Sequence, residues 1–168
     1  MESLAGDYVV LRPLDEGDRA EVRRVLADPS VARGWGPGGL EARVDEMFTD
    51  DGTVRFVIVV DGRIGGTVQF VEEKEPDYRH AGLDIFLDAE HQGAGHGVDA
   101  LRTLARHLID ERGHHRLTID PSAANVRAIR AYAKVGFRPV GTMRRYERGP
   151  DGTFHDGLLM DLLADELR

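Results

Sequence analysis

A glycine-rich turn between a strand-like run and a helix-like run is the feature that most restricts how this chain can fold. Residues 81–87 are typical of a strand, and residues 98–110 carry apolar side chains at helical spacing. The turn between them reads Gln92-Gly93-Ala94-Gly95-His96-Gly97. Its glycines permit positive φ and close approach of the main chain, and a helix N-terminus attracts anions. The turn therefore predicts a phosphate site, with a flexible surface turn as the alternative.

Two familiar nucleotide-binding patterns do not fit this turn. It lacks the Lys-Ser/Thr ending of a P-loop, and it does not follow a first strand with a ribose-binding acid downstream. The run alone is therefore a weakly specific signal for phosphate binding.

The rest of the chain alternates strands and helices. Residues 54–60 and 64–71 are strand-like and are joined by Asp61-Gly62, a strong hairpin signal. We predict further strands over 8–14, 81–87, 116–119, 137–146 and 158–163, and helices over 15–26, 40–48, 98–110 and 125–135. The pattern predicts a single α/β domain over residues 1–168, built on a mostly antiparallel sheet.

Composition excludes several classes of protein. At 168 residues the chain can bury one substantial core. No apolar run reaches the roughly 18–20 residues needed to span a bilayer, and residues 1–4 have no signal-peptide character. The chain has no cysteine, so disulfides and thiolate chemistry are excluded. We expect a cytoplasmic protein without a membrane partner.

The formal net charge is −8, from 22 basic and 30 acidic residues. This balance opposes a nucleic-acid partner, which normally requires a basic patch. It is compatible with a cationic substrate attracted by a negative field, and solubility alone is the alternative.

A second motif makes the interpretation of the glycine-rich turn more specific. The pattern Gln92-x-x-Gly95-x-Gly97, the helix after it, and the stretch from Asp120-Pro121 through Asn125 and Tyr132 to Gly136-Phe137 resemble the GNAT family of acetyltransferases. The resemblance implies the GNAT fold, of the α/β (α+β) class. This is a mixed, mostly antiparallel sheet of six to seven strands flanked by about four helices.

The resemblance also implies acetyl-CoA as the acetyl donor. Residues Gln92, Gly93, Ala94, Gly95, His96 and Gly97 would bind its pyrophosphate. Asn125 would hydrogen-bond the pantetheine arm, and Tyr132 would lie beside the sulfur. Helical spacing is consistent with this, because Asn125, Ala128 and Tyr132 share one face. Taken alone, Tyr132 could equally be a packed aromatic residue.

Asp84 is the only charge in the apolar run 81–87. Burial raises the pKa of a carboxyl group, which suits a general base that also holds an incoming ammonium. An exposed position on the strand and a partner for an arginine are the alternatives. Here the chain resembles the aminoglycoside 6′-N-acetyltransferase branch of the family, in which the aspartate matching Asp84 is the proposed base.

Other acidic residues are candidates on the substrate side. The resemblance implies that Asp120 contacts the cationic acceptor and that Asp156 is a substrate-side acid in some members; Asp120 alone could be a turn residue before Pro121. An acidic rim for the acceptor is predicted at Glu72, Glu73, Glu75 and Asp77, with a solvated charged loop as the alternative. Trp35, in a glycine-rich loop, is either a sugar-stacking platform or a hydrophobic plug.

No metal site is expected, because the histidines lack matching carboxylate spacing. Neither HExxH nor GxSxG is present, so metalloprotease and serine-hydrolase functions are not supported.

The expected reaction is direct acetyl transfer to a primary amine of a cationic small molecule, foremost the 6′-amine of an aminoglycoside. A backbone N–H near Phe86 or Leu87 would polarise the thioester carbonyl, Asp84 would take a proton from the amine, and Tyr132 would return one to the thiolate. A siderophore-type or protein N-terminal acyltransferase of the same fold and a non-catalytic CoA-binding module are the alternatives. We expect a monomer or a homodimer.

Overall fold

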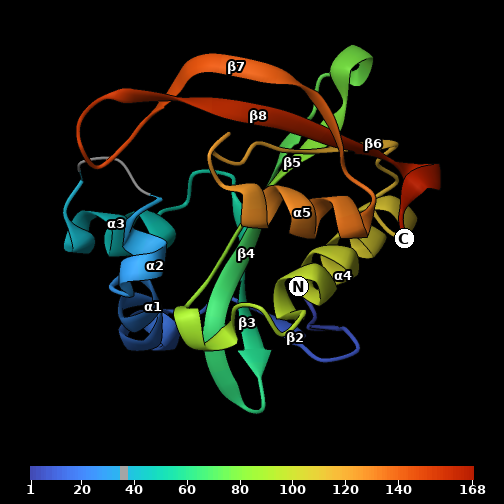
Figure 1. Ribbon diagram of the computed structural model, residues 1–168. Helices are drawn as coiled ribbons and strands as arrows, with labels where there is room; N and C mark the ends of the chain where they lie inside the picture. The colour runs from blue at the N-terminus through green and yellow to red at the C-terminus, as the bar shows by residue number, and fades with distance from the viewer. Residues whose placement is uncertain (35–37) are drawn as a thin grey trace.

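The computed structural model describes residues 1–34 and 38–168, and within them the strands form one eight-stranded sheet (Figure 1). The order across the sheet is β1-β2-β3-β4-β5-β6-β8-β7. All neighbours are antiparallel except β5 and β6, which are parallel. The strands are β1 (Leu4–Ala5), β2 (Val10–Pro13), β3 (Val54–Val60), β4 (Arg63–Glu73), β5 (His80–Leu87), β6 (Arg116–Ile119), β7 (Arg138–Arg148) and β8 (Phe154–Leu163).

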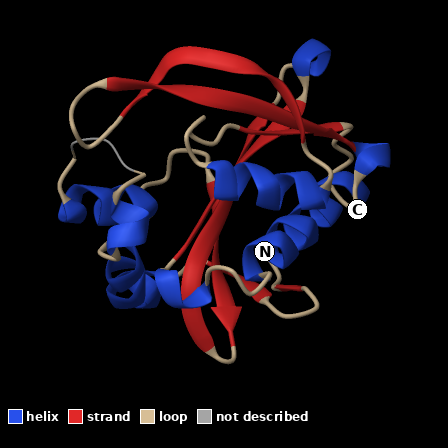
Figure 2. Ribbon diagram, viewed as in Figure 1, coloured by secondary structure: helices blue, strands red, loops and turns tan. Residues whose placement is uncertain are grey.

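Five α-helices of the described chain cover the two faces of this sheet (Figure 2). They are α1 (Arg19–Leu26), α2 (Pro29–Ala32), α3 (Leu40–Met47), α4 (His96–Asp110) and α5 (Val126–Val135). Short 3₁₀ turns occupy Glu16–Asp18, Pro76–Tyr78, Ala89–His91 and Ala164–Glu166. Helices α1 to α3 lie together on one side, and α4 and α5 lie on the other (Figure 1). Over residues 1–34 and 38–168, none of the helices combines the length and apolarity needed to cross a bilayer.

The alternating direction of the side chains along β3 explains why helices pack on both faces of the sheet. Phe56 and Ile58 are fully buried in the larger core, together with residues of α4 and α5. Val57, between them, is fully buried in a second core with α1 and α3. Successive side chains of a strand point to opposite faces, so a continuous apolar run such as β3 must be covered on both sides.

The predicted hairpin between β3 and β4 is confirmed. Asp61 and Gly62 have φ of 49° and 78°, and Val60 pairs with Arg63 across the turn. Positive φ at both central residues matches the twist of the flanking strands.

The parallel pair β5–β6 is short and then opens. Pairing is restricted to Ala81 with Leu117 and Gly82 with Thr118. Strand β5 stays with β4 as far as Leu87, which pairs with Gly66. The chain after β6 instead follows β8, because the N–H of Leu158 donates to the carbonyl of Pro121 at 2.9 Å. One edge of β5 therefore lacks a strand partner from Leu83 onward within the described chain.

The mixed, mostly antiparallel sheet is as predicted, but the element counts are higher. The additional strand β1 has two residues and the additional helix α2 has four, too short to show a hydrophobic period. Strand β8 begins at Phe154 rather than at residue 158. The residues before 158 lack an apolar pattern but still pair with β7, and this pairing extends the strand. Helix α4 begins inside the glycine turn, at His96.

A buried carboxylate on α4 ties down the N-terminal segment. Asp99 is 3% exposed and accepts hydrogen bonds from the backbone N–H groups of Asp7, Tyr8 and Val9 at 3.1, 2.7 and 3.0 Å. These contacts join the start of the sheet to the helix that follows the glycine turn.

The Asp99→Ala substitution leaves these N–H groups without their acceptor. Each buried donor left unsatisfied costs about 1–3 kcal/mol. We expect a total loss of about 3 kcal/mol and a melting temperature lower by about 6–12 °C. Scanning calorimetry measures the shift. Asp110→Ala, on an exposed residue of the same helix, is the matched control. Equal melting temperatures for the two variants would contradict this role of Asp99.

Candidate active site

A cavity of about 1230 Å³ lies at the opening between β5 and the chain that follows β6. Its walls come from the second half of β5, the glycine turn, one face of α5, residues of β7 and the segment around α2. Phe86 and Leu87 of β5 are among the lining residues. The free edge of β5 thus borders a space large enough for an extended ligand.

The glycine turn presents backbone N–H groups to this cavity. Gly93 and Gly95 adopt φ of 83° and 90°, which residues with side chains rarely tolerate. Gly95 is also the N-cap of α4, so no capping side chain competes for the N–H groups of the first turn. Gly93, Gly95 and Gly97 line the cavity. The arrangement fits a phosphate group, as a helix N-terminus with a glycine turn does in general.

Helix α5 contributes three cations to the cavity wall. Arg127, Arg130 and Lys134 all line the cavity, and their spacing places them along one side of the helix. None of the three forms an ion pair with a carboxylate in the part of the chain that the structure describes. Their charge is therefore available to an anionic ligand.

The predicted face of α5 is also in place. Asn125, Ala128 and Tyr132 all line the cavity. Asn125 caps α5, since its side-chain oxygen accepts from the N–H of Ala128 at 3.1 Å. Its side-chain amide nitrogen is the group left to contact a ligand.

Three carboxylates also border the cavity. Asp84, Asp120 and Glu147 line it, and none has an ion pair within residues 1–34 and 38–168. The Asp84 carboxylate opens into the cavity, where it accepts the N–H of Ile85 at 2.9 Å and the side-chain amide of Gln69 at 3.4 Å.

The Asp84 side chain is exposed within the cavity, but the surrounding protein separates it from bulk water. This desolvation raises the pKa of its carboxyl, and the negative charges of Asp120 and Glu147 raise it further. The N–H of Ile85 opposes this shift. Burial, followed by the charge of Asp120, likewise raises the pKa of Glu147. Such carboxyl groups bind protons more readily than usual and attract cations.

Tyr132 lies beside this acidic group. Its side chain is 8% exposed and packs edge-on against Phe137, with ring centroids 6.4 Å apart. Burial first, and then the charges of Asp84 and Asp120, raise the pKa of its hydroxyl well above the ordinary value. That hydroxyl has no hydrogen-bond partner among the described residues, so it holds a proton that is free for a ligand.

Sequence reasoning missed two residues of β7. The Tyr146 hydroxyl donates to the Asp120 carboxylate, and this bond together with burial raises the pKa of Tyr146 to about 12. Glu147 lies next to it in the cavity wall. A register shift between Met143 and Glu147 changes how this part of β7 pairs with β8. No sequence periodicity signals such a bulge, so the sequence alone did not identify Tyr146 and Glu147 as site residues.

Asp156 supports this bulge. Its carboxylate accepts the N–H of Arg145 at 2.8 Å, and Arg145 has a φ of 50°. Asp156, predicted on the substrate side, is not among the residues that line the cavity. It holds the strand that carries Tyr146 and Glu147 instead.

The predicted acidic rim is not at the cavity either. Glu72 is bonded to Arg112 and His114 at 2.7 and 2.8 Å, and the Arg112 bond lowers its pKa to about 2. Glu73 accepts the N–H of Glu75 at 2.9 Å, and Asp77 lies in the 3₁₀ turn after β4. None of these lines the cavity, because β4 extends to Glu73 and carries them beyond its end.

The remaining predictions divide as follows. Ala94 and His96 belong to the glycine turn but do not line the cavity. Trp35 lies outside the described residues. Within the described chain, no group of three His, Cys, Asp or Glu side chains is arranged to hold a metal ion.

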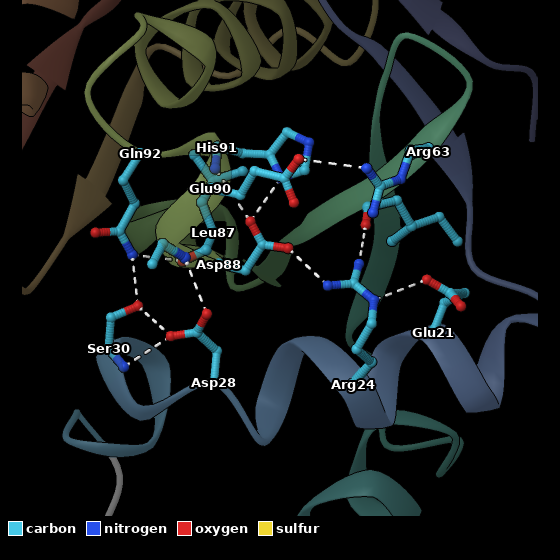
Figure 3. A network of polar contacts seen from close by, with 12 residues as sticks. Glu21, Arg24, Asp28, Ser30, Arg63, Leu87, Asp88, Glu90, His91 and Gln92 are labelled. Carbon is cyan, nitrogen blue, oxygen red and sulfur yellow. Dashed lines mark hydrogen bonds and ion pairs between the residues drawn. The ribbon is translucent and has the colours of Figure 1, made fainter.

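A polar network lies behind the glycine turn (Figure 3). Asp88 accepts hydrogen bonds from Arg24 at 2.9 Å and contacts His91, while Asp28 accepts the N–H of Ala89 at 3.1 Å. Helix α1 and the segment before α2 therefore hold the 3₁₀ turn that leads into the glycine turn.

Comparison with known proteins agrees with this geometry. A family model described as an acetyltransferase (GNAT) domain matches residues 9–138. An aminoglycoside N(6′)-acetyltransferase type 1 from Klebsiella pneumoniae is 30% identical over 170 residues, covering 88% of this chain and 81% of that protein. A spermidine N(1)-acetyltransferase from Escherichia coli (strain K12) is 30% identical over 141 residues, covering 80% of this chain and 75% of that protein.

Solved structures share the fold. Mycobacterium smegmatis RimJ in complex with CoA-disulfide superposes with a TM-score of 0.84 at 26% identity, covering 98% of this chain and 87% of that chain. A Vibrio cholerae spermidine N-acetyltransferase, solved with CoA and spermine, has a TM-score of 0.79 at 21% identity, covering 95% of this chain and 97% of that chain.

The raised pKa of Asp84 predicts how stability depends on pH. A carboxyl whose folded pKa lies above its ordinary 3.8 favours folding below that value, and this contribution is lost as pH rises through the folded pKa. Asp84→Asn does not titrate. We therefore expect its melting temperature to exceed that of the wild type by a margin that grows with pH. Melting curves from about pH 4 to about pH 8 measure the margin. Asp77→Asn, at a residue that does not line the cavity, is the matched control. A margin independent of pH would contradict the shift.

Proposed function

The chain belongs to the GNAT family of acetyltransferases, and from that premise we propose that it acetylates a primary amine of a polycationic small molecule. The 6′-amine of an aminoglycoside is the foremost acceptor. One observation carries the proposal. Asp84, Asp120 and Glu147 share a cavity wall without a single cation paired to them in the described chain. Unneutralised carboxylates in a recess attract a ligand with several positive charges.

GNAT acetyltransferases use acetyl-CoA, and the other end of the cavity fits it. Gly93 and Gly95 form a cradle that a Cβ would strain, and Arg127 lies beside it. In our proposal the glycine turn and the N-terminus of α4 hold the pyrophosphate, while Asn125 contacts the pantetheine arm. When bound, acetyl-CoA supplies an acetyl group activated as a thioester.

Asp84 has the properties of the general base. Its raised pKa brings the proton affinity of the carboxylate closer to that of an amine. This closer match improves proton transfer from the acceptor. In its ionised form it holds the acceptor ammonium and then takes one of its protons, directly or through water. The amine gains the lone pair that forms the new C–N bond.

Tyr132 has the properties of the general acid. Its high pKa and its burial keep the hydroxyl protonated at neutral pH. It holds that proton on its oxygen for the sulfur that leaves as the C–S bond breaks. Leu87, on the edge of β5 that borders the cavity, would supply a backbone N–H to polarise the carbonyl.

Asp120, Tyr146 and Glu147 form a second subsite for the acceptor in this proposal. The Tyr146 hydroxyl fixes the Asp120 carboxylate, and Glu147 adds a carboxylate with a raised pKa. A second ammonium of the acceptor bound there would align the first with Asp84, which lowers the entropy cost of reaction.

Spermidine is the second candidate acceptor, since it is also a polycation and a spermidine N(1)-acetyltransferase is 30% identical to this chain. A protein N-terminus offers one charge where the cavity offers three carboxylates, so it is a poorer match. Siderophore-type transfer and a non-catalytic CoA-binding role are further outcomes of the test below.

The decisive test is thiol release from acetyl-CoA over a panel of kanamycin, spermidine, an N-terminal peptide and a hydroxamate precursor. We expect turnover with the polycations, and expect Asp84→Asn and Tyr132→Phe to lower kcat about 10²- to 10³-fold. Wild-type rates in both variants would sink the assigned roles. CoA binding without turnover on any acceptor would identify a binding module instead.

The second subsite predicts a selective effect of Glu147→Gln. Loss of a charge-assisted contact worth about 1.5 kcal/mol raises the KM for a polyamine about tenfold. The KM for a monoamine acceptor should not change. Initial-rate kinetics with spermidine and with butylamine make the comparison, and Glu73→Gln is the matched control, since Glu73 does not line the cavity. An equal rise of KM for both amines would show that Glu147 does not bind a second charge.

A further inference from the structure

We infer that Arg127 binds the pyrophosphate of CoA and that Gln92 positions Arg127 rather than binding phosphate itself. This inference rests on the proposed function, because it concerns the donor end of the same cavity. It assigns a binding role to a residue of α5 that lies outside the glycine turn.

The side chain of Gln92 is already fully engaged by protein groups. Its amide nitrogen donates to the carbonyl of Leu87 at 2.6 Å and to the hydroxyl of Ser30 at 3.0 Å (Figure 3). Its amide oxygen accepts from Arg127 Nη1 at 3.0 Å. An amide group has two donor hydrogens, and both are used here. The side chain of Gln92 therefore has no donor left for a phosphate.

Chemistry fixes which way this amide points. The carbonyl of Leu87 can only accept a hydrogen bond, and a guanidinium can only donate one. The nitrogen of Gln92 must face Leu87 and its oxygen must face Arg127. Flipping the amide would break both contacts.

The anchor of Gln92 continues into the segment around α2, where Ser30 also lines the cavity. The Ser30 hydroxyl donates to the Asp28 carboxylate at 2.6 Å, and that carboxylate also accepts the N–H groups of Ser30 and Ala89 (Figure 3). Ser30 is therefore held by its own hydrogen bonds when it accepts from Gln92. Segments before and after β5 thus fix the amide to which Arg127 donates.

Arg127 lies at the glycine turn. Its Nη2 is 3.1 Å from the position that a Cβ on Gly93 would take, and both residues line the cavity. The guanidinium has five N–H donors. Gln92 accepts from one nitrogen and carries no charge, so the positive charge of Arg127 stays unneutralised. Held at the end of its side chain next to the turn, the guanidinium can meet two phosphate oxygens at once.

Titration calorimetry with CoA and with dephospho-CoA tests the inference without needing an acceptor. Both ligands keep the pyrophosphate, and only CoA has the 3′-phosphate. We expect Arg127→Gln to weaken both by the same factor, about tenfold or more. The affinities of Arg127→Lys should lie between those of the wild type and of Arg127→Gln, because lysine keeps the positive charge but lacks the two-pronged donor geometry of a guanidinium. Arg106→Gln, on the exposed side of α4, controls for the change in net charge.

The outcomes of these titrations distinguish the possible roles of Arg127. A loss with CoA that disappears with dephospho-CoA would assign Arg127 to the 3′-phosphate and overturn the inference, as would unchanged affinity for both. An Arg127→Gln protein with a lowered melting temperature and a loss equal to that of Arg127→Lys would show a structural role instead. Failure of the wild type to bind CoA would overturn the proposed function rather than this assignment.

The positioning role of Gln92 has its own test. Gln92→Leu removes the acceptor that holds Arg127, so we expect a smaller loss of CoA affinity. In the double variant with Arg127→Gln the loss should equal that of Arg127→Gln alone, because residues that act through one another are not additive. Additive losses would show that Gln92 contacts the ligand independently.

Discussion

The separation of β5 from the chain after β6 is the constraint on which the site depends. The two strands pair at Ala81 and Gly82, and then each follows a different neighbour, β4 on one side and β8 on the other. Hydrogen bonds from Leu158 to Pro121 and from Ala123 to Asp156 keep the second branch with β8. A backbone edge in the middle of a sheet is thereby left without a strand partner. The glycine turn, α5 and the bulge of β7 are all arranged around this opening.

Charges of both signs line the opening. Arg127 lies beside the glycine turn, Arg130 and Lys134 lie further along α5, and Asp84, Asp120 and Glu147 line the same cavity. Burial, and then the like charges gathered in the recess, raise the pKa values of Asp84 and Glu147. Such a distribution costs stability in the free protein and is relieved when ligands of opposite charge bind. It suits a cavity that takes both an anionic and a cationic ligand, as proposed above.

The sequence predicted the features that depend on local pattern. The β3–β4 hairpin, the glycine turn and the shared face of Asn125, Ala128 and Tyr132 follow from turn chemistry and helical period, and the structure has them. The features it did not predict depend on distant partners. Glu72 turned out to be bonded to Arg112 and His114, which are about 40 residues away. Tyr146 and Glu147 reach the cavity through a bulge that Asp156 stabilises from the neighbouring strand. No single segment of the sequence contains the information that specifies these pairings.

The most direct test of the account is a crystal structure of the protein with CoA and kanamycin bound together. The account predicts that the CoA phosphates lie against the glycine turn and the cations of α5. It also predicts that an ammonium of the antibiotic lies within hydrogen-bond distance of Asp84, with a second one at Asp120 or Glu147. An aminoglycoside bound outside the acidic end, or phosphates placed among the carboxylates, would contradict the division of the cavity.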